Sequence, residues 1–263
     1  MSLIVTPIPA FDDNYIWLIQ SASSTCVAVV DPGDSAPVLA YLEDHQLSLN
    51  AILITHHHPD HIGGVEALAE RYPDAKIFAP HSAKIPLAKT RVSEGDYFTL
   101  CEHTFNVIEV PGHTLDHIAY FATSQAEGEY GSLFCGDTLF ASGCGRMFEG
   151  TPPMMSASLD KLRTLPSNTL VYCAHEYTLA NIAFARAVEP HNEDLAKRQE
   201  QAEQSREIGQ PTLPSTIDLE LRTNPFIRCH IESVKEMAQN HADKSLETQA
   251  EVFGALRAWK DNF

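Results

Sequence analysis

The sequence predicts a protein of the α/β class, with an α/β domain followed by a smaller helical domain. Its first two-thirds alternate short β-rich runs with turns and a few helices, whereas after about residue 175 the strand patterns cease and helix-forming residues dominate. The length of 263 residues also suits one medium and one small domain. We therefore expect domains at residues 1–174 and 175–263.

Short runs rich in Val, Ile, Phe and Tyr, bounded by turn residues, predict the strands of the first domain. They are residues 15–20, 26–31, 51–55, 76–79, 105–110, 118–122, 132–135 and 169–173. Apolar residues at helical spacing predict helices over 36–46, 64–72 and 153–165. The first domain is thus expected to combine strands and helices in alternation.

The second domain is expected to consist of helices over residues 179–188, 192–208, 232–241 and 245–261. Asn192 stands where a residue that caps a helix N-terminus is needed. Three prolines at positions 211, 214 and 225 interrupt the chain between the second and third of these helices. We expect that stretch to be irregular.

The net charge of the chain disfavours some classes of binding partner. With 18 Lys and Arg against 35 Asp and Glu, the net charge is −17, which disfavours nucleic acids and anionic membranes but permits a small anionic substrate held by local cations. No apolar run is long enough to span a bilayer, and the first residues lack the basic region of a secretory signal. We expect a cytoplasmic monomer.

The six cysteines lie far apart, at positions 26, 101, 135, 144, 173 and 229, and none forms a C-x-x-C pair. In a chain of this length, buried free thiols in a reducing compartment are favoured over disulfides.

Four apolar runs each have His or Asp just past their C-terminal end. These followers are His56, His57, His58, Asp60 and His61 after residues 51–55, His113 after 107–110, Asp137 after 133–135, and His175 after 170–173. The loops at strand ends converge on a common crevice in α/β sheets, so these side chains are expected to meet there.

Spacing assigns sides within the first group. In an extended segment His56 and His58 point the same way and His57 the opposite way. If His57 is left out, five histidines and two aspartates remain as ligand-type residues. Seven ligands are too many for one tetrahedral zinc ion, but they suit two ions with Asp137 as a bridge. Any one of these histidines alone is more often a hydrogen-bonded structural residue, and Asp60 alone a helix cap. We expect His57 to contact solvent or the ligand side chains and not the metal. His117, four residues after His113, is expected to contact the ligand side chains.

The residues that carry this pattern resemble a known family. Residues 55–61, T-H-H-H-P-D-H, match the T-H-x-H-x-D-H signature of the metallo-β-lactamase superfamily, and Gly112-His113, Gly136-Asp137 and His175 match its later metal motifs in order. More specific marks resemble the hydroxyacylglutathione hydrolases, the glyoxalase II family. They are G-D-T-L-F at 136–140, G-C-G-R at 143–146, Y-C-A-H-E-Y at 172–177, E-P at 189–190, P-S-T at 214–216 and N-P-F at 224–226.

The resemblance implies an αββα metallo-β-lactamase sandwich followed by a smaller α-helical, substrate-binding C-terminal domain. It implies that metal 1 takes His56, His58 and His113, that metal 2 takes Asp60, His61 and His175, and that Asp137 bridges them. Asp60 and Asp137 are then the catalytic residues. The substrate-binding residues implied are Arg146, Phe148, Tyr177, Arg257 and Lys260, with Phe148 where relatives often carry Tyr and Arg146 where they often carry Lys.

The activity implied is thioester hydrolysis. The substrate would be S-(2-hydroxyacyl)glutathione, chiefly S-(D-lactoyl)glutathione, cleaved to glutathione and D-lactate by a hydroxide that bridges the metals, the second step of methylglyoxal detoxification. Two divalent ions are implied, with Zn²⁺ expected first and iron or manganese compatible with the same ligands.

Four alternatives stay open on the sequence. A β-lactamase or lactonase would share the metal ligands but not the helical tail, and an iron-dependent persulfide dioxygenase would need only a His, His and Asp site. The acidic composition disfavours a nuclease. A non-catalytic metal-binding scaffold would not need seven ligands.

Overall fold

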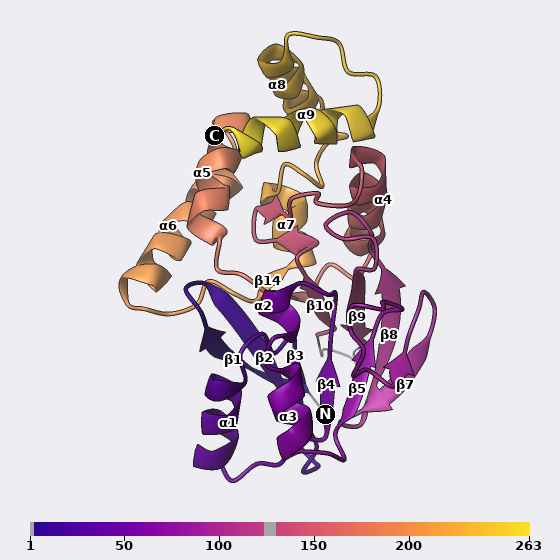
Figure 1. Cartoon of the computed structure of the whole chain (residues 1–263). Coiled ribbons are helices and arrows are strands. Elements are labelled where there is room, and N and C mark those ends of the chain that lie inside the picture. Colours follow the sequence, from indigo (N-terminus) through magenta and orange to yellow (C-terminus); the bar gives the residue numbers. More distant parts are fainter. Residues whose placement is uncertain (1–2, 124–129) are drawn as a thin grey trace. The chain divides into compact units, whose positions relative to one another are not determined.

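A computed structural model describes residues 3–123 and 130–263 of the chain (Figure 1). These residues fall into two compact units. Unit 1 consists of Met1–Glu109 and Asp116–Gly136, and unit 2 of Val110–Leu115 and Asp137–Phe263. The predicted division at residues 174 and 175 stays a prediction.

The first sheet of unit 1 has the strand order β1-β2-β3-β4-β5-β6. Its strands are β1 (Leu3–Ala10), β2 (Asn14–Ser21), β3 (Val27–Val30), β4 (Ala51–Leu53), β5 (Lys76–Ala79) and β6 (Thr90–Arg91). The first three strands pair antiparallel, and β3 to β6 run parallel. Among the parallel strands, β3 and β4 are continuous apolar runs because both of their faces are covered.

A second sheet of unit 1 contains β7 (Tyr97–Leu100), β8 (His103–Glu109), β9 (Ile118–Ala122) and β10 (Ser132–Gly136), paired antiparallel in this order. The two sheets pack face to face. The rings of Phe78 and Phe98 stack with centroids 4.0 Å apart, and the Tyr120 hydroxyl donates to the Ile54 carbonyl at 2.9 Å. That hydroxyl is fully buried, and desolvation raises its pKa well above the usual value.

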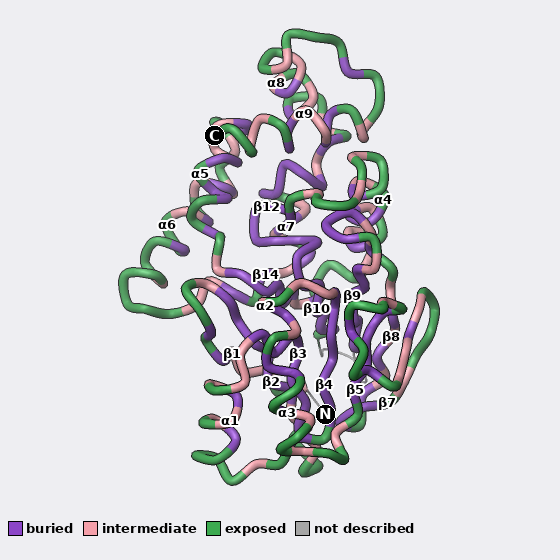
Figure 2. The backbone as a smooth tube through the Cα atoms, in the orientation of Figure 1, coloured by how far each residue is buried: buried purple, intermediate pink, exposed green. Residues whose placement is uncertain are grey.

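Helices cover the outer face of the first sheet. They are α1 (Ser35–Asp44), α2 (Pro59–Ile62) and α3 (Val65–Arg71). Figure 1 shows α1 and α3 in front of this sheet, and Val38, Leu42 and Leu68 join its side chains in one apolar cluster. Figure 2 shows buried backbone along the strands and exposed residues on the outer sides of the helices. The expected α/β class is confirmed.

Unit 2 is mainly helical. Its elements are β11 (Leu139–Phe140), β12 (Gly143–Cys144), α4 (Pro152–Arg163), β13 (Leu170–Cys173), α5 (Thr178–Val188), α6 (Glu193–Glu207), β14 (Ser215–Thr216), α7 (Ile217–Thr223), α8 (Glu232–Ala242) and α9 (Gln249–Asp261). Asn192 caps α6 by accepting from the Leu195 N–H, as predicted. Thr248 and Glu251 form a capping box that starts α9 at Gln249, four residues later than the expected 245.

Between α6 and α8 the sequence prediction was incomplete. The stretch expected to be irregular contains β14, which pairs with β13, and the seven-residue helix α7. A strand of two residues carries no alternation that could reveal it, and α7 is too short to show a helical period. Thr216 caps α7 by accepting from the Leu219 N–H, a local signal that was available in the sequence.

Two cysteines correct the expectation of free thiols. Cys26, just before β3, and Cys101, between β7 and β8, form a disulfide with their Cα atoms 5.1 Å apart. They are 75 residues apart in the sequence, so only the packing of the two sheets brings them together. The other four cysteines are buried free thiols, as expected.

Among the described residues, no helix combines the length and the apolar character needed to cross a membrane.

Candidate metal ligands and substrate-binding residues

The segment from the end of β4 through α2 carries four of the predicted metal ligands. Asp31, at the end of β3, fixes the start of this segment by accepting hydrogen bonds from the Thr55 N–H and the Thr55 hydroxyl, both at 2.7 Å. Its Oδ2 also lies 3.0 Å from Nδ1 of His61. A carboxylate that holds one ring nitrogen of a histidine leaves the other nitrogen oriented as a metal ligand.

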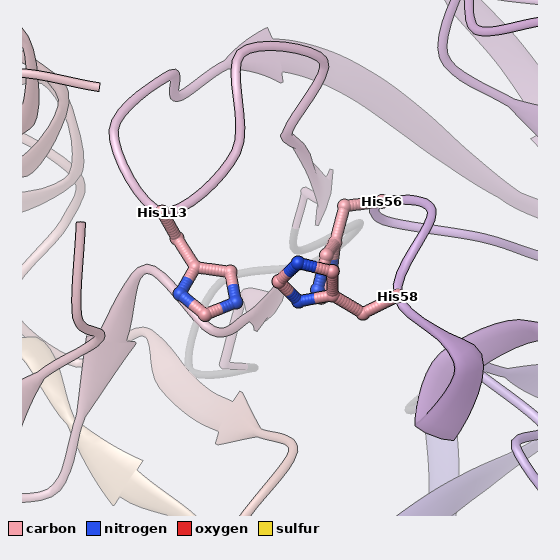
Figure 3. A group of neighbouring side chains, drawn as sticks. All are labelled: His56, His58 and His113. Atoms are coloured by element: carbon pink, nitrogen blue, oxygen red, sulfur yellow. The ribbon is translucent and has the colours of Figure 1, made fainter. Parts of the chain in front are cut away.

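These four ligands gather within unit 1. The rings of His56 and His58 have centroids 4.7 Å apart, and Figure 3 shows both leaving the same loop. The His61 ring lies 4.1 Å from that of His56, and its Nε2 is 3.4 Å from Oδ2 of Asp60. His56 and His61 are completely buried. The expected clustering of these side chains is therefore present inside the unit.

Asp60 lies in the first turn of α2, where Pro59 occupies the first helical position. Its Oδ2 accepts a hydrogen bond from the Asn14 side chain at 3.1 Å. A carboxylate at a helix N-terminus is electrostatically favoured. Asn14 sits at the start of β2, and nothing in the sequence pattern pointed to it.

His57 has other partners, in agreement with the side assigned to it. Its Nδ1 lies 2.8 Å from an oxygen of Asp116, and its Nε2 lies 2.8 Å from the Lys84 ammonium. Because an ammonium only donates, Nε2 must accept, and Nδ1–H donates to Asp116. The His117 ring stacks on the ring of His56, a predicted ligand, with centroids 4.5 Å apart.

The other three predicted ligands belong to unit 2. His113 follows β8 along the chain and is the third side chain labelled in Figure 3; Asp137 follows β10, and His175 follows β13. One oxygen of the Asp137 carboxylate is 3.3 Å from Nε2 of His113, and the other is 3.4 Å from Nε2 of His175. Asp137 therefore lies between the two imidazoles, with one oxygen for each.

The backbone holds this arrangement in place. Nδ1 of His113 is 2.8 Å from the Arg146 carbonyl, so it donates there and Nε2 keeps its lone pair toward Asp137. Gly145 is needed for the close approach of the chain, because a Cβ at this position would lie 1.9 Å from the Asp137 carbonyl oxygen. This accounts for the second glycine of the G-C-G-R motif.

The two cations predicted on α9 are more enclosed than a surface pair. Arg257 is 3% exposed; it donates to the Cys144 carbonyl and to Asp261, both at 3.0 Å. Its Nε is buried and has no hydrogen-bond partner among the described residues. Burial first, and then the charge of Arg257, lower the pKa of Lys260 to about 8.

The other predicted substrate-binding residues are accessible. Arg146 is exposed and lies 3.6 Å from a carboxylate oxygen of Asp261. The exposed Tyr177 ring stacks on His175 at 4.7 Å, and the exposed Phe148 ring meets His113 edge to face at 5.2 Å. Each of these residues thus lies beside a predicted metal ligand or beside the α9 charges.

The donors present are those that zinc, iron and manganese take in proteins: imidazole nitrogens and carboxylate oxygens, several of them backed by a carboxylate or a backbone carbonyl. His and Asp groups that could hold a metal ion are present among the described residues. The residues therefore fit the metal ions that the sequence implied.

Comparison with known proteins decides the family. Residues 10–175 match the model of the Metallo-beta-lactamase superfamily, and residues 176–263 match that of the Hydroxyacylglutathione hydrolase C-terminus. The chain is 51% identical over 260 residues to a hydroxyacylglutathione hydrolase of Pseudomonas paraeruginosa, covering 98% of this chain and 99% of that one. The chain belongs to the hydroxyacylglutathione hydrolase family.

Other relatives agree with this membership. A hydroxyacylglutathione hydrolase of Photobacterium profundum is 50% identical over 262 residues, which cover 99% of this chain and 100% of the relative. The fold is shared with ETHE1 from Myxococcus xanthus, with a TM-score of 0.64, 24% identity and 99% and 98% of the two chains covered. TTHA1623, solved in a di-iron-bound form, gives a TM-score of 0.58 at 25% identity, with 85% of this chain and 99% of that chain covered.

The expected enzyme class, a hydrolase of the glyoxalase II type with the metallo-β-lactamase fold and a helical C-terminal part, is confirmed by this membership. The fold together with the His and Asp groups indicates a dinuclear metal site.

One residue beside the ligands could have been found in the sequence. Asp31 stands at the end of a predicted strand, in the same position as the ligands that follow the other strands. His113 and Asp137 were selected because they follow predicted strands, and Asp31 meets the same criterion. Asp31 is not part of the family signature, and the sequence prediction did not include it.

Proposed function

We propose that the chain hydrolyses S-(2-hydroxyacyl)glutathione thioesters, chiefly S-(D-lactoyl)glutathione, to glutathione and a 2-hydroxy acid. The observation that carries the proposal is the Asp137 carboxylate, which offers one oxygen to His113 and the other to His175. A carboxylate placed in this way is suited to bridge two metal ions, each of which also takes one of the two imidazoles. Full-length relatives named for this activity support it.

In this proposal metal 1 is held by His56, His58 and His113, and metal 2 by Asp60, His61 and His175. Asp137 bridges the two. Zn²⁺ is proposed first because five imidazoles and two carboxylates are donors that zinc commonly takes. Iron fits the same donors, and the related TTHA1623 has been solved with two iron ions. Metal analysis of protein purified without added metal distinguishes these loadings.

Two divalent ions held by these residues would supply hydroxide at neutral pH and would polarise the thioester carbonyl. The chain itself orients the reactants. Asn14 donates to one oxygen of Asp60 and so helps to fix the carboxylate, which we propose orients the attacking hydroxide in addition to binding metal. The departing thiolate needs little protonation because a thiol ionises near about pH 8.5.

The substrate is an anion, and the chain is strongly acidic, so local cations must hold it. We propose that Lys260, Arg146 and the free Nε of Arg257 provide the positive field for the glutathione carboxylates. The Tyr177 hydroxyl adds a neutral donor beside His175. Phe148 cannot donate a hydrogen bond, so its exposed ring can offer the substrate only apolar contact.

A thioester-cleavage assay with two substrates tests the proposal. Purified protein is given S-(D-lactoyl)glutathione and, in parallel, the lactoyl thioester of coenzyme A, and thioester loss is followed. We expect cleavage of the glutathione ester at a kcat/KM at least about a hundredfold higher, since only its carboxylates match the α9 cations. Equal cleavage of both would contradict the substrate, and cleavage of neither by metal-loaded protein would contradict the reaction.

A location in the cytoplasm and a monomeric state stay predictions. Size-exclusion chromatography with light scattering measures the second directly.

A further inference from the structure

Three motifs of unit 2 have no role in the proposed chemistry: P-S-T at 214–216, E-P at 189–190 and N-P-F at 224–226. Two of them meet in a buried polar cluster, whose members are Arg198, Ser215, Glu220, Thr223 and Asn224. All five side chains are at most 5% exposed. So many buried polar groups in one place are stable only if they satisfy one another, and each of them is hydrogen-bonded.

The inner part of this polar cluster is an ion pair. Arg198 lies 2.5 Å from Oε1 of Glu220 and also donates to Thr223 at 2.6 Å and to Ser215 at 2.8 Å. These contacts join α6, α7 and β14. They use one oxygen of Glu220 and leave the other, Oε2, directed elsewhere.

That second oxygen and Asn224 form hydrogen bonds with the backbone of the β11–β12 hairpin. Glu220 Oε2 accepts from the Ser142 N–H at 2.9 Å. The Asn224 amide nitrogen donates to the carbonyls of Phe140 at 3.1 Å and Gly143 at 2.9 Å, and also contacts Glu220. A third side chain, Asn181 of α5, donates to the Ala141 carbonyl at 3.0 Å.

The hairpin needs these contacts because its own backbone pairing contributes little stability. It consists of two-residue strands joined by a turn in which Ser142 has φ of 54°, a conformation that is unfavourable for a residue with a side chain. An isolated hairpin of this size is not stable in water. Four hydrogen bonds from the buried side chains of Glu220, Asn224 and Asn181 therefore help to fix its position.

The two ends of the hairpin touch the residues that we assign to the site. At one end, the Phe140 ring meets His175 and Tyr177 edge to face, at 5.8 Å and 5.4 Å. At the other end, the Cys144 carbonyl accepts from Arg257 at 3.0 Å. A shift of the hairpin would thus move a wall beside His175 and also the acceptor that orients the Arg257 guanidinium.

We propose that Asn224 and Glu220 are positioning residues, which fix the β11–β12 hairpin and through it the orientation of Arg257 and the placement of Tyr177 for substrate binding. Neither side chain needs to touch the substrate. The consequence for binding rests on the proposed function, whereas the fixing of the hairpin does not.

The test compares Asn224→Ala with Thr223→Val, a neighbour in the same polar cluster whose hydroxyl is hydrogen-bonded to Arg198 and to the Leu219 carbonyl. Two measurements are made on metal-loaded protein: amide hydrogen exchange of residues 139–144, and the kinetics of glutathione-thioester cleavage. For Asn224→Ala we expect hairpin exchange to accelerate at least about tenfold and KM to rise about tenfold, with kcat changed less than about threefold. Thr223→Val should leave hairpin exchange and KM at wild-type values.

A double variant separates positioning from general damage. If Asn224 acts through Arg257, then Asn224→Ala combined with Arg257→Ala should have nearly the KM of Arg257→Ala alone. A KM equal to the product of the two single effects would overturn the route through Arg257. Should Asn224→Ala fail to fold, Glu220→Gln alters the contact to the Ser142 N–H and is expected to accelerate the same amides.

Unchanged exchange of residues 139–144 in a folded Asn224→Ala or Glu220→Gln protein would overturn the proposal. If the wild-type protein proves inactive on glutathione thioesters, the proposed function fails, and the exchange experiment still decides whether the hairpin is fixed in this way.

Discussion

The lowered pKa of Lys260 predicts a particular pH dependence of substrate binding. Burial and the neighbouring Arg257 charge bring this pKa to about 8. Under the proposed function, Lys260 attracts a substrate carboxylate as an ammonium below pH 8 and loses that charge above pH 8. The KM for the glutathione thioester should therefore rise as the pH rises through 8, whereas an ordinary lysine would titrate near about 10.4.

The size of the effect follows from the charge fractions. With a pKa of about 8, about nine-tenths of Lys260 is charged at pH 7 and about one-tenth at pH 9. If the charged contact contributes about 1.4 kcal/mol, the lower end for hydrogen bonds to charged groups, its loss raises KM about tenfold. Weighting by the two fractions gives a rise of about fivefold between pH 7 and pH 9.

The assay measures KM between pH 6.5 and 9.5, with spontaneous thioester hydrolysis subtracted. Lys260→Arg is the matched control, because its guanidinium stays charged throughout and any titration of the substrate affects both proteins equally. Lys260→Met should show the higher KM already at pH 7. A wild-type KM that changes with pH in parallel with that of Lys260→Arg would refute the assignment of Lys260 to substrate binding.

Three further outcomes are expected. Asp137→Asn should lose bound metal and at least about a hundredfold of turnover, measured by metal analysis and kinetics, because a neutral amide bridges two cations poorly; full metal content in the variant would remove Asp137 as the bridge. Wild-type protein should contain about two divalent ions per chain and lose activity with a chelator, and one ion in fully active protein would contradict the dinuclear site. Reducing the Cys26–Cys101 disulfide, which joins residues 75 positions apart, should lower the free energy of unfolding by about 3–4 kcal/mol in denaturant titrations, whereas Cys26→Ser should be insensitive to reductant.

Local sequence patterns were enough to predict most of the strands that precede the predicted ligands along the chain. Strands at 76–79 and 118–122 were predicted with the bounds of β5 and β9, because they are short apolar runs between turn residues. The same patterns placed His113, Asp137 and His175 just after strands. The side assignment of His57 also came from local geometry alone, since alternate residues of an extended segment point to opposite sides.

Contacts between residues far apart in the chain could not be predicted from local sequence patterns. The sequence gave no reason to pair Cys26 with Cys101, or Asn14 with Asp60, because each pair is joined only by the packing of elements far apart in the chain. The same holds for Arg257: judged by helical spacing it was a surface cation, and its burial follows from the hairpin and from Asp261 around it.

The amino-acid sequence by itself determined the class of fold, the seven ligand-type residues and the family, since these depend on periodicity and on residue types at fixed spacing. Only the tertiary structure decided which oxygen of Asp137 faces which imidazole, why Lys260 has a pKa of about 8, and what holds the hairpin at residues 139–144. Those properties depend on distance, desolvation and hydrogen-bond partners, which exist only when segments far apart in the chain are folded together.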